Sequence, residues 1–368
     1  MRAFASPSRY YQGPGLLADL GARTVHLGDR AGVLLSSRNT ETLGEGITAS
    51  LTAAGIASTL VPFGGEASHE EIDRVSDALR PDGLAFVIGV GGGKALDTAK
   101  AVAWKLGLPV VIVPTIAATD SPTAASSVIY TPDGVFVEEI PYPVNPAVVL
   151  VDSEVIAHAP ARYLVSGMGD ALATRFEARA CLRSGAVTFV GGRPTRLAGA
   201  IAELCYEIVM ADGLAAADDV RAQRVTPALE RVIEANVLLS GLGWESAGMA
   251  AAHSIHNGLT AIPGTRQTYH GELVAFATVA QLVMEDAEDE ALALSRFCRR
   301  LGMPVRLAEL GVDTSDRAGL LDAAEKACAP GESIHNMPMP VSPGQVADAI
   351  ARADAIARDA GSENDQEG

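Results

Sequence analysis

The chain has 368 residues, of which 48% are hydrophobic and 20% are charged. This composition is enough for a large buried core and excludes a disordered polypeptide. The 28 Lys and Arg against 45 Asp and Glu give a formal net charge of −17, and only 5% of the residues are aromatic. Nucleic-acid partners need clustered basic residues or stacked aromatic rings, so we expect none.

The apolar runs and the cysteines indicate the cellular compartment of the chain. No run of 18 apolar residues occurs, so we expect no membrane partner. None of the four cysteines forms a C-x-x-C pair with another, which argues against a zinc knuckle or a redox pair. Four reduced thiols in a chain of this length favour the cytoplasm.

The first 155 residues alternate short β-branched runs with helical stretches. Predicted strands cover 31–37, 58–63, 84–90, 109–114 and 147–151, and predicted helices cover 42–54, 68–79 and 94–106. Strand–helix alternation of this kind predicts a parallel sheet with helices on both faces, a Rossmann-like α/β architecture.

From about Pro160 the pattern changes to long stretches rich in Ala and Leu. Predicted helices cover 160–184, 194–211, 226–260, 271–286, 289–301, 317–328 and 343–359. We therefore predict an α/β dinucleotide-binding domain over 1–160 and an all-α domain for metal and substrate over 161–360. The polar residues 361–368 are predicted to form a disordered tail.

A glycine-rich loop follows the predicted strand 84–90. Gly91, Gly92, Gly93 and Lys94 lie between this buried strand and the helix 94–106. Glycines let the backbone approach a pyrophosphate, the helix start supplies free N–H donors, and Lys94 adds a positive charge. The loop is not a Walker A motif. We interpret it as a phosphate-binding loop, with a purely structural turn as the alternative.

Hydroxyl groups and a carboxylate cluster after the next predicted strand, in the segment 113–122 that includes Thr115 and Asp120. Ligands bind beyond the carboxyl ends of parallel strands, so this segment is a second candidate for the site. The alternative is an Asx turn that only closes the loop.

Two histidine segments and one aspartate suggest a metal site. His253 and His256 lie in a long helical pattern, His270 lies at the start of the next one, and Asp170 lies among small residues at a helix start. Two imidazoles and a carboxylate with an open fourth position are typical of catalytic zinc. The H-x-x-H spacing alone is weak evidence for a metal site, because a histidine in a helix is more often a hydrogen-bonded core residue.

With these motifs in place, the chain closely resembles the bacterial glycerol dehydrogenases. They are a zinc-dependent branch of the iron-containing alcohol dehydrogenase superfamily, with a dehydroquinate-synthase-like fold. The likeness runs from about Ser6 to beyond the His335–Pro338 segment. It is carried by 63–66 (FGGE), 91–94 (GGGK), 97–100 (DTAK), 114–117 (PTIA), 127–130 (SVIY), 169–174 (GDALAT), 225–231 (VTPALER) and 256–263 (HNGLTAIP).

The resemblance implies roles for single residues. Asp170, His253 and His270 match the ligands of Zn²⁺, and Thr174 stands where iron-binding relatives carry a further His. Asp120 matches a contact to a substrate hydroxyl and, with His253 and His270, is a candidate catalytic residue. The candidate contacts to NAD⁺ or NADP⁺ are Ser36, Ser37, Arg38, Gly91, Gly92, Gly93, Lys94, Thr115, Ala118, Ala124, Ser126 and Tyr130. The resemblance also implies a homo-octamer or another homo-oligomer.

The sequence departs from the family pattern near the coenzyme. Ser36-Ser37-Arg38 replaces a segment with an aspartate that would bond the ribose 2′-hydroxyl. Loss of that charge beside Arg38 favours acceptance of NADP(H). The alternative is that another group, such as Glu41, bonds the ribose. Ala118 replaces a hydroxyl residue, and Ala124 and Ser126 also differ, which alters the pocket expected near the nicotinamide.

These observations predict a metal-dependent oxidoreductase. It would convert glycerol or a related 1,2-diol to dihydroxyacetone or another hydroxyketone with NAD(P)⁺, the metal acting as a Lewis acid. One alternative is a dehydrogenase of the same fold for another polyol, an amino-polyol, a hydroxyketone or a phosphorylated glycerol. The dehydroquinate-synthase reaction is disfavoured by the ligand set. A non-catalytic dinucleotide-binding protein would have a broken metal triad or glycine loop.

Overall fold

A computed structural model describes residues 1–362. The chain forms two compact units. The sheet unit comprises Ala5–Tyr163 and Asp219–Gly241, and the helical unit comprises Met1–Phe4, Leu164–Asp218 and the chain from Leu242. The predicted fold class, a parallel sheet with helices followed by an all-helical part, is confirmed. Of the predicted tail, 363–368 lies outside the described residues.

Six strands of the sheet unit form a parallel sheet in the order β1-β8-β5-β4-β2-β3. In this sheet Leu35 pairs with Val90, and Gly91 pairs with Pro114. The carboxyl ends of β2, β4 and β5 therefore meet at one edge, where ligands bind in such sheets. The strands are β1 (Tyr10–Gly13), β2 (Arg30–Ser36), β3 (Ala57–Phe63), β4 (Phe86–Gly91), β5 (Val110–Pro114) and β8 (Val148–Asp152).

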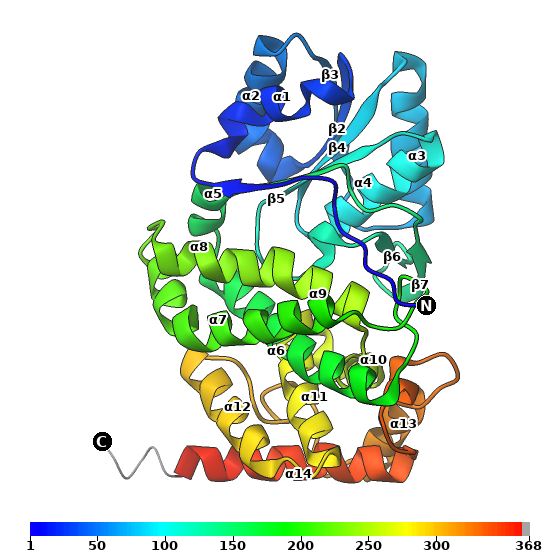
Figure 1. The fold of residues 1–368 in the computed structure, drawn as a ribbon, viewed down its shortest axis with the longest axis vertical. Coiled ribbons are helices and arrows are strands. Elements are labelled where there is room, and N and C mark those ends of the chain that lie inside the picture. Colours follow the sequence, from blue (N-terminus) through cyan, green and yellow to red (C-terminus); the bar gives the residue numbers. More distant parts are fainter. Residues whose placement is uncertain (363–368) are drawn as a thin grey trace. The chain divides into compact units, whose positions relative to one another are not determined.

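Helices cover both faces of this sheet (Figure 1). On one face, Val33 and Leu35 pack with the helices α1 (Leu20–Thr24) and α2 (Ser37–Ala53). On the other face, Leu34 packs with α3 (His69–Leu79) and α4 (Gly93–Leu106). Alternate residues of β2 thus enter opposite apolar cores, and this is why the strand reads as a continuous hydrophobic run.

The remaining elements of the sheet unit flank the sheet. An antiparallel pair, β6 (Ser126–Tyr130) and β7 (Phe136–Pro141), packs by β6 against α4. The segment Asp219–Gly241 also belongs to this unit and contains α8 and a π-helical turn. The short helix α5 follows β8 directly. Their bounds are α5 (Ser153–Ala157), α8 (Pro227–Glu234) and the π-turn (Ala235–Leu239).

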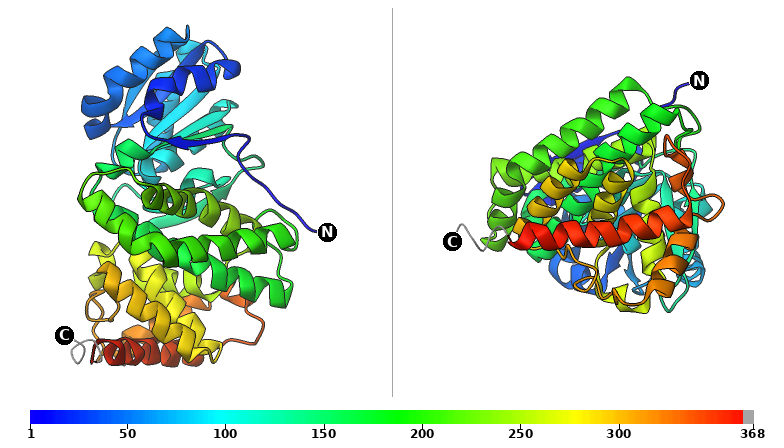
Figure 2. Two further views of the ribbon diagram at one scale, coloured as in Figure 1. Left: turned by 60° about the vertical axis from the view of Figure 1, so that its left-hand side comes forward. Right: turned by 90° about the horizontal axis from the view of Figure 1, so that it is seen from below.

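The helical unit contains eight long or medium helices, and α14 runs across α11, α12 and α13 (Figure 2). The helices are α6 (Ala161–Ser184), α7 (Arg196–Arg221), α9 (Ser240–Ala247), α10 (Ala251–Thr260), α11 (His270–Met284), α12 (Glu288–Leu301), α13 (Arg317–Ala327) and α14 (Pro343–Ser362).

The single helix predicted over 226–260 is wrong. The structure divides it into α8, the π-turn, α9 and α10, with a break at Gly248. Gly248 has a φ of 102°, and a Cβ on it would lie 2.8 Å from the Cys181 sulfur. The break depends on a close approach to α6 that helical periodicity does not report.

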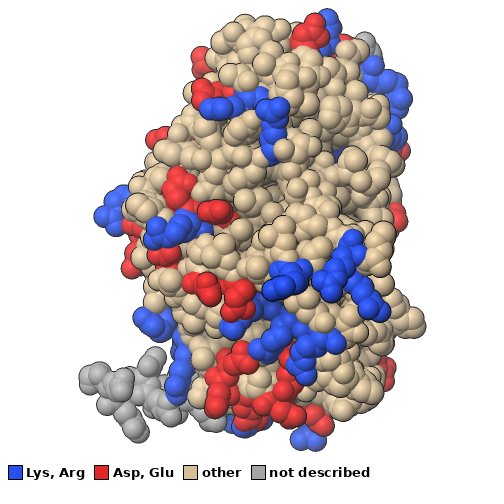
Figure 3. Space-filling model, in the orientation of Figure 1, with Lys and Arg blue, Asp and Glu red and all other residues tan. Residues whose placement is uncertain are grey.

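Acidic and basic side chains are interspersed on the face in Figure 3. The ion pairs of the helical unit include Arg175–Glu203 and Arg179–Glu290. Among the described residues, every helix is too short or too polar to cross a bilayer.

Candidate active site

Two helices of the helical unit touch through glycines beside Asp170. Asp170 lies in the middle of α6, not at its start as the small-residue pattern suggests. A Cβ on Gly169 would lie 2.2 Å from the Gly271 carbonyl oxygen, and one on Gly271 would lie 1.8 Å from that of Ser166. This contact of backbones brings His270, the first residue of α11, next to the Asp170 carboxylate.

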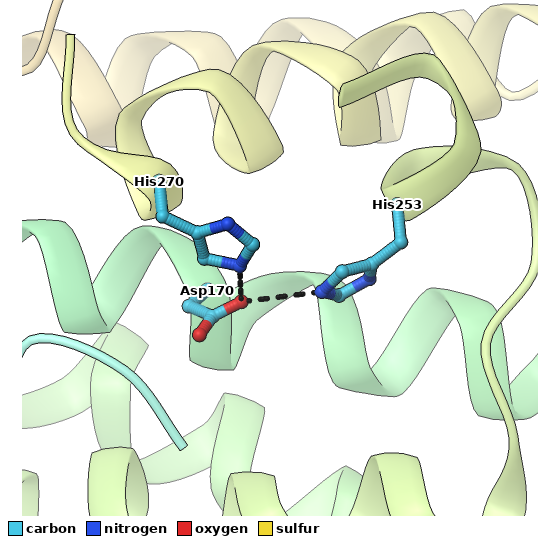
Figure 4. Close-up of side chains that lie close together, drawn as sticks. All are labelled: Asp170, His253 and His270. Atoms are coloured by element: carbon cyan, nitrogen blue, oxygen red, sulfur yellow. Dashed lines mark ion pairs between the residues drawn. The ribbon is translucent and has the colours of Figure 1, made fainter. Parts of the chain in front are cut away.

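Asp170, His253 and His270 form the cluster in which a metal ion fits (Figure 4). The Asp170 Oδ1 atom lies 3.4 Å from His253 Nε2 and 3.3 Å from His270 Nε2. Asp170 is buried, and neither carboxylate oxygen has a hydrogen-bond partner among the described residues. Ligands of a tetrahedral zinc ion, each about 2.0–2.1 Å from the metal, lie about 3.3 Å apart. The spacing and the unsatisfied carboxylate therefore fit a shared cation.

The electrostatics of the cluster favour a divalent cation. Burial raises the pKa of Asp170, but His270 and His253 outweigh it and hold that pKa below its ordinary value. Burial lowers the pKa of His253, but Glu177 and Asp170 outweigh it and raise that pKa well above the ordinary value. The carboxylates of Asp170 and Glu177 therefore favour positive charge in this buried site, and a divalent cation would supply it.

Each candidate metal-binding histidine has a second polar partner. Glu177 Oε2 lies 2.6 Å from His253 Nδ1, and His256 Nε2 lies 3.0 Å from His270 Nδ1. Glu177 was missed by the sequence reasoning. Its signal is the seven-residue spacing from Asp170, which places both carboxylates on one face of α6. His256 is buried and belongs to the H-x-x-H pattern noted in the sequence, and the structure places it against His270.

The glycine loop lies in the sheet unit, between β4 and α4. Gly91 ends β4, Gly92 is the N-cap of α4, and Gly93 is the first residue of the helix. A Cβ on Gly91 would lie 2.8 Å from the Cβ of Ala95, so this turn requires glycine. The N–H groups at the start of α4 are available to an anion.

Lys94 and Tyr130 lie together beside the glycine loop. The Lys94 ammonium is 2.5 Å from Glu66 Oε2 and 5.1 Å from the centre of the Tyr130 ring. The lysine side chain is half exposed. Three segments of the sheet unit, represented by Glu66, Lys94 and Tyr130, thus meet at one place.

The end of β2 is linked to the end of β5. Ser36 caps α2, its Oγ accepting a hydrogen bond from the Asn39 backbone N–H at 3.4 Å. The Asn39 side chain donates to Thr115 Oγ1 at 3.4 Å. Arg38 is exposed, and Ser37 is the first residue of α2. The structure therefore brings Ser36 and Thr115 to the same sheet edge.

Asp120 is buried and fixed within the sheet unit. Its Oδ2 accepts a hydrogen bond from Ser240 Oγ at 2.8 Å. A Cβ on Gly241 would lie 2.8 Å from the Asp120 carbonyl oxygen and 1.9 Å from Thr123 Oγ1. The segment 219–241 therefore packs closely against Asp120, a contact between parts of the chain 120 residues apart.

A buried ion pair secures the loop after Asp120. Lys100 and Asp97 of α4 are 2.8 Å apart, and Lys100 also donates to the carbonyl oxygens of Ser121 and Ser126. Ala124 in this loop and Ser126 at the start of β6 are buried, and Ala118 is half-buried. Sequence reasoning did not assign Asp97 and Lys100, although both belong to one of the motifs that carry the family resemblance.

The chain was compared with known proteins. The model of the family "Iron-containing alcohol dehydrogenase" matches residues 7–153. A glycerol dehydrogenase of Escherichia coli O6:H1 is 47% identical over 354 residues, covering 96% of both chains. A crystal structure of glycerol dehydrogenase from Schizosaccharomyces pombe is 38% identical, has a TM-score of 0.95, and covers 99% of this chain and 93% of that one.

The chain belongs to the iron-containing alcohol dehydrogenase family. This membership makes it an oxidoreductase. A glycolaldehyde reductase of Halobacterium salinarum is also 45% identical, covering 96% of this chain and 98% of the relative. Because these relatives match nearly the full length, the likeness includes the helical unit with the candidate metal cluster.

Proposed function

We propose that the chain catalyses the oxidation of glycerol, or of a related 1,2-diol, to the hydroxyketone with NAD⁺ or NADP⁺. The observation that carries the proposal is the cluster of Asp170, His253 and His270, with its unsatisfied buried carboxylate. Full-length likeness to enzymes named glycerol dehydrogenase supports this substrate class.

Zinc is the metal that we propose for this cluster. Asp170, His253 and His270 would bind the ion, and Thr174, one turn after Asp170, offers no imidazole as a fourth ligand. Three protein ligands leave a position for a substrate hydroxyl, as in catalytic zinc sites. When bound, the ion supplies Lewis acidity that lowers the pKa of that hydroxyl.

The residues of the sheet unit bind the coenzyme and orient the diol in this proposal. The N–H groups at Gly92 and Gly93 bind the pyrophosphate, and Lys94 adds its charge. Asp120 accepts a hydrogen bond from a substrate hydroxyl. Because Ser240 fixes the Asp120 carboxylate, little freedom is lost when the diol binds.

We also propose that the coenzyme site accepts NADP⁺. The first turn of α2 contains no acidic residue, and exposed Arg38 lies in it, two residues after the end of β2. A carboxylate at this place would repel a 2′-phosphate, whereas a guanidinium binds one.

The test is an activity matrix of NAD⁺ and NADP⁺ against glycerol, other 1,2-diols and glycolaldehyde, with the metal content measured on the same preparation. We expect turnover of glycerol by protein containing one zinc per chain. Protein that binds zinc and coenzyme but oxidises no diol would contradict the proposal. Faster reduction of glycolaldehyde would favour the second candidate function, a hydroxyaldehyde reductase, which the Halobacterium relative supports.

We propose a homo-oligomer as the working state. Apolar side chains are exposed on α6 and α7, where Leu182, Leu197 and Leu204 are 44%, 57% and 46% exposed. Burial of such side chains against another copy is favourable. Light scattering on the purified protein tests the assembly, and a monomer would contradict it.

We propose a cytoplasmic location for the chain. All four cysteines are free, and three of them are buried. Free thiols of this kind are usual in a reducing compartment. Fractionation of the source cells tests the location.

A further inference from the structure

A second buried carboxylate beside the cluster, that of Glu177, lies against the start of α10, two helical turns after Asp170 on α6. Glu177 is fully buried, and its Oε1 accepts hydrogen bonds from the backbone N–H groups of Ala250 and His253 at 2.8 and 3.1 Å. Its Oε2 faces His253 Nδ1 at 2.6 Å. One side chain therefore holds both the backbone and the imidazole of His253.

This arrangement defines which imidazole nitrogen carries hydrogen. A carboxylate only accepts hydrogen bonds, so the contact at 2.6 Å requires a hydrogen on His253 Nδ1. In the neutral ring Nε2 is then the atom with the free lone pair, and Nε2 is the atom that lies 3.4 Å from Asp170. Glu177 thus orients His253 with its ligating atom toward the cluster.

We propose that Glu177 is a positioning residue of the metal centre that selects the ligating tautomer of His253. The inference rests on the proposed zinc site. Glu177 would not itself hold the ion, because it faces His253 Nδ1 while His253 Nε2 faces Asp170. Its negative charge also strengthens the imidazole as a ligand.

The substitution Glu177→Gln separates positioning from packing. The side chain keeps its size, but it has one acceptor oxygen for three donors. If that oxygen faces the two backbone N–H groups, the amide NH₂ faces Nδ1 and favours the tautomer with hydrogen on Nε2, which cannot bind metal. If the oxygen faces Nδ1 instead, the buried N–H groups lose their acceptor.

Gln281 provides a matched control. Its Oε1 accepts from the backbone N–H groups of Ala251 and Ala252 at 3.1 and 2.9 Å, so it holds the same helix start without contacting an imidazole. Gln281→Met removes this support while keeping the length of the side chain. Both variants are expected to lower the melting temperature, because each removes buried hydrogen bonds.

The experiment measures the zinc dissociation constant by competition with a chromophoric chelator, together with the melting temperature of the zinc-free protein. We expect Glu177→Gln to weaken zinc binding about 10- to 100-fold and Gln281→Met to change it less than about threefold. Equal losses in the two variants, or unchanged binding in Glu177→Gln, would overturn the inference. Should Glu177→Gln not fold, Glu177→Asp, whose shorter chain cannot span the same contacts, is compared with Gln281→Met by the same criterion. Failure of the wild-type chain to bind zinc would instead refute the proposed function.

Discussion

His256 Nε2 lies 3.0 Å from His270 Nδ1, so the buried His256 imidazole is the hydrogen-bond partner of a member of the candidate metal cluster. Burial lowers the pKa of His256 well below its ordinary value, and His270 and His253 lower it further. His256 is therefore neutral. Its Nδ1 lies 3.1 Å from Asn257 Oδ1 and donates to it, which leaves Nε2 as an acceptor for His270.

The first prediction concerns this imidazole pair. His256→Phe removes the acceptor for His270 Nδ1, and we expect zinc binding to weaken about tenfold. His256→Gln is the comparison, because its amide oxygen can lie where the imidazole Nε2 lies and offers an acceptor again. Chelator competition measures both variants, and unchanged binding in His256→Phe would show that the pair does not orient His270.

The second prediction concerns the ligand itself. His270→Ala leaves two of the three donors, so we expect more than about a 100-fold loss of zinc affinity and nearly complete loss of turnover. The far-ultraviolet circular dichroism should stay that of the folded protein. Metal analysis of the purified variant is the measurement, and full activity without zinc would refute the site.

The third prediction concerns selection of the diol. Asp120→Asn keeps the shape of the side chain but weakens a charged hydrogen bond worth about 1.5–3 kcal/mol. We expect kcat/KM for glycerol to fall about 10- to 100-fold while the KM for the coenzyme changes little. Steady-state kinetics with each substrate varied in turn provide the check. A larger effect on the KM for the coenzyme than on kcat/KM for glycerol would contradict a contact between Asp120 and the diol.

The fourth prediction concerns the coenzyme. Arg38→Asp adds negative charge at the first turn of α2, so we expect kcat/KM with NADP⁺ to fall at least about tenfold and that with NAD⁺ to be unchanged or higher. Arg38→Gln removes the attraction for the 2′-phosphate without adding repulsion, so it separates the two effects. A wild-type preference for NAD⁺ of about tenfold or more would contradict NADP⁺ acceptance at this site, since one tenfold step is 1.4 kcal/mol.

The fifth prediction concerns stability. Asp354 of α14 accepts hydrogen bonds from the Arg306 guanidinium at 2.8 and 3.1 Å and from the Leu307 backbone N–H at 3.0 Å. Burial raises the pKa of Asp354, but these contacts and Arg358 outweigh it and lower that pKa below 3.8. We expect Asp354→Asn to cost about 2 kcal/mol at pH 7.

The lowered pKa gives the sign of the pH dependence. The stabilisation by Asp354 is complete above the ordinary carboxyl pKa and is lost as the pH falls through the lower pKa of the folded state. The difference between wild type and Asp354→Asn should therefore shrink below about pH 4. Denaturant titrations at several pH values test this. Glu288→Gln is the control, because the Glu288–Arg352 pair joins the same helix through two exposed side chains and should contribute nothing measurable.

The sequence by itself determined the features that depend on short stretches of chain. Alternating strands and helices, the glycine turn before α4 and the small residues around Asp170 are local patterns, so they predict the class of fold and the type of site. The three residues of the candidate metal cluster were predicted from resemblance to a family whose motifs recur here.

Only the tertiary structure decided how distant segments meet. The seven-residue spacing places Glu177 on the same face of α6 as Asp170, but its contact with His253 depends on where α10 begins. That start is set by the break at Gly248, where the backbone approaches Cys181. Likewise, segment 219–241 joins the sheet unit and holds Asp120 through Ser240. Such contacts arise from the packing of elements far apart in the chain, and hydrophobic periodicity contains no information about them.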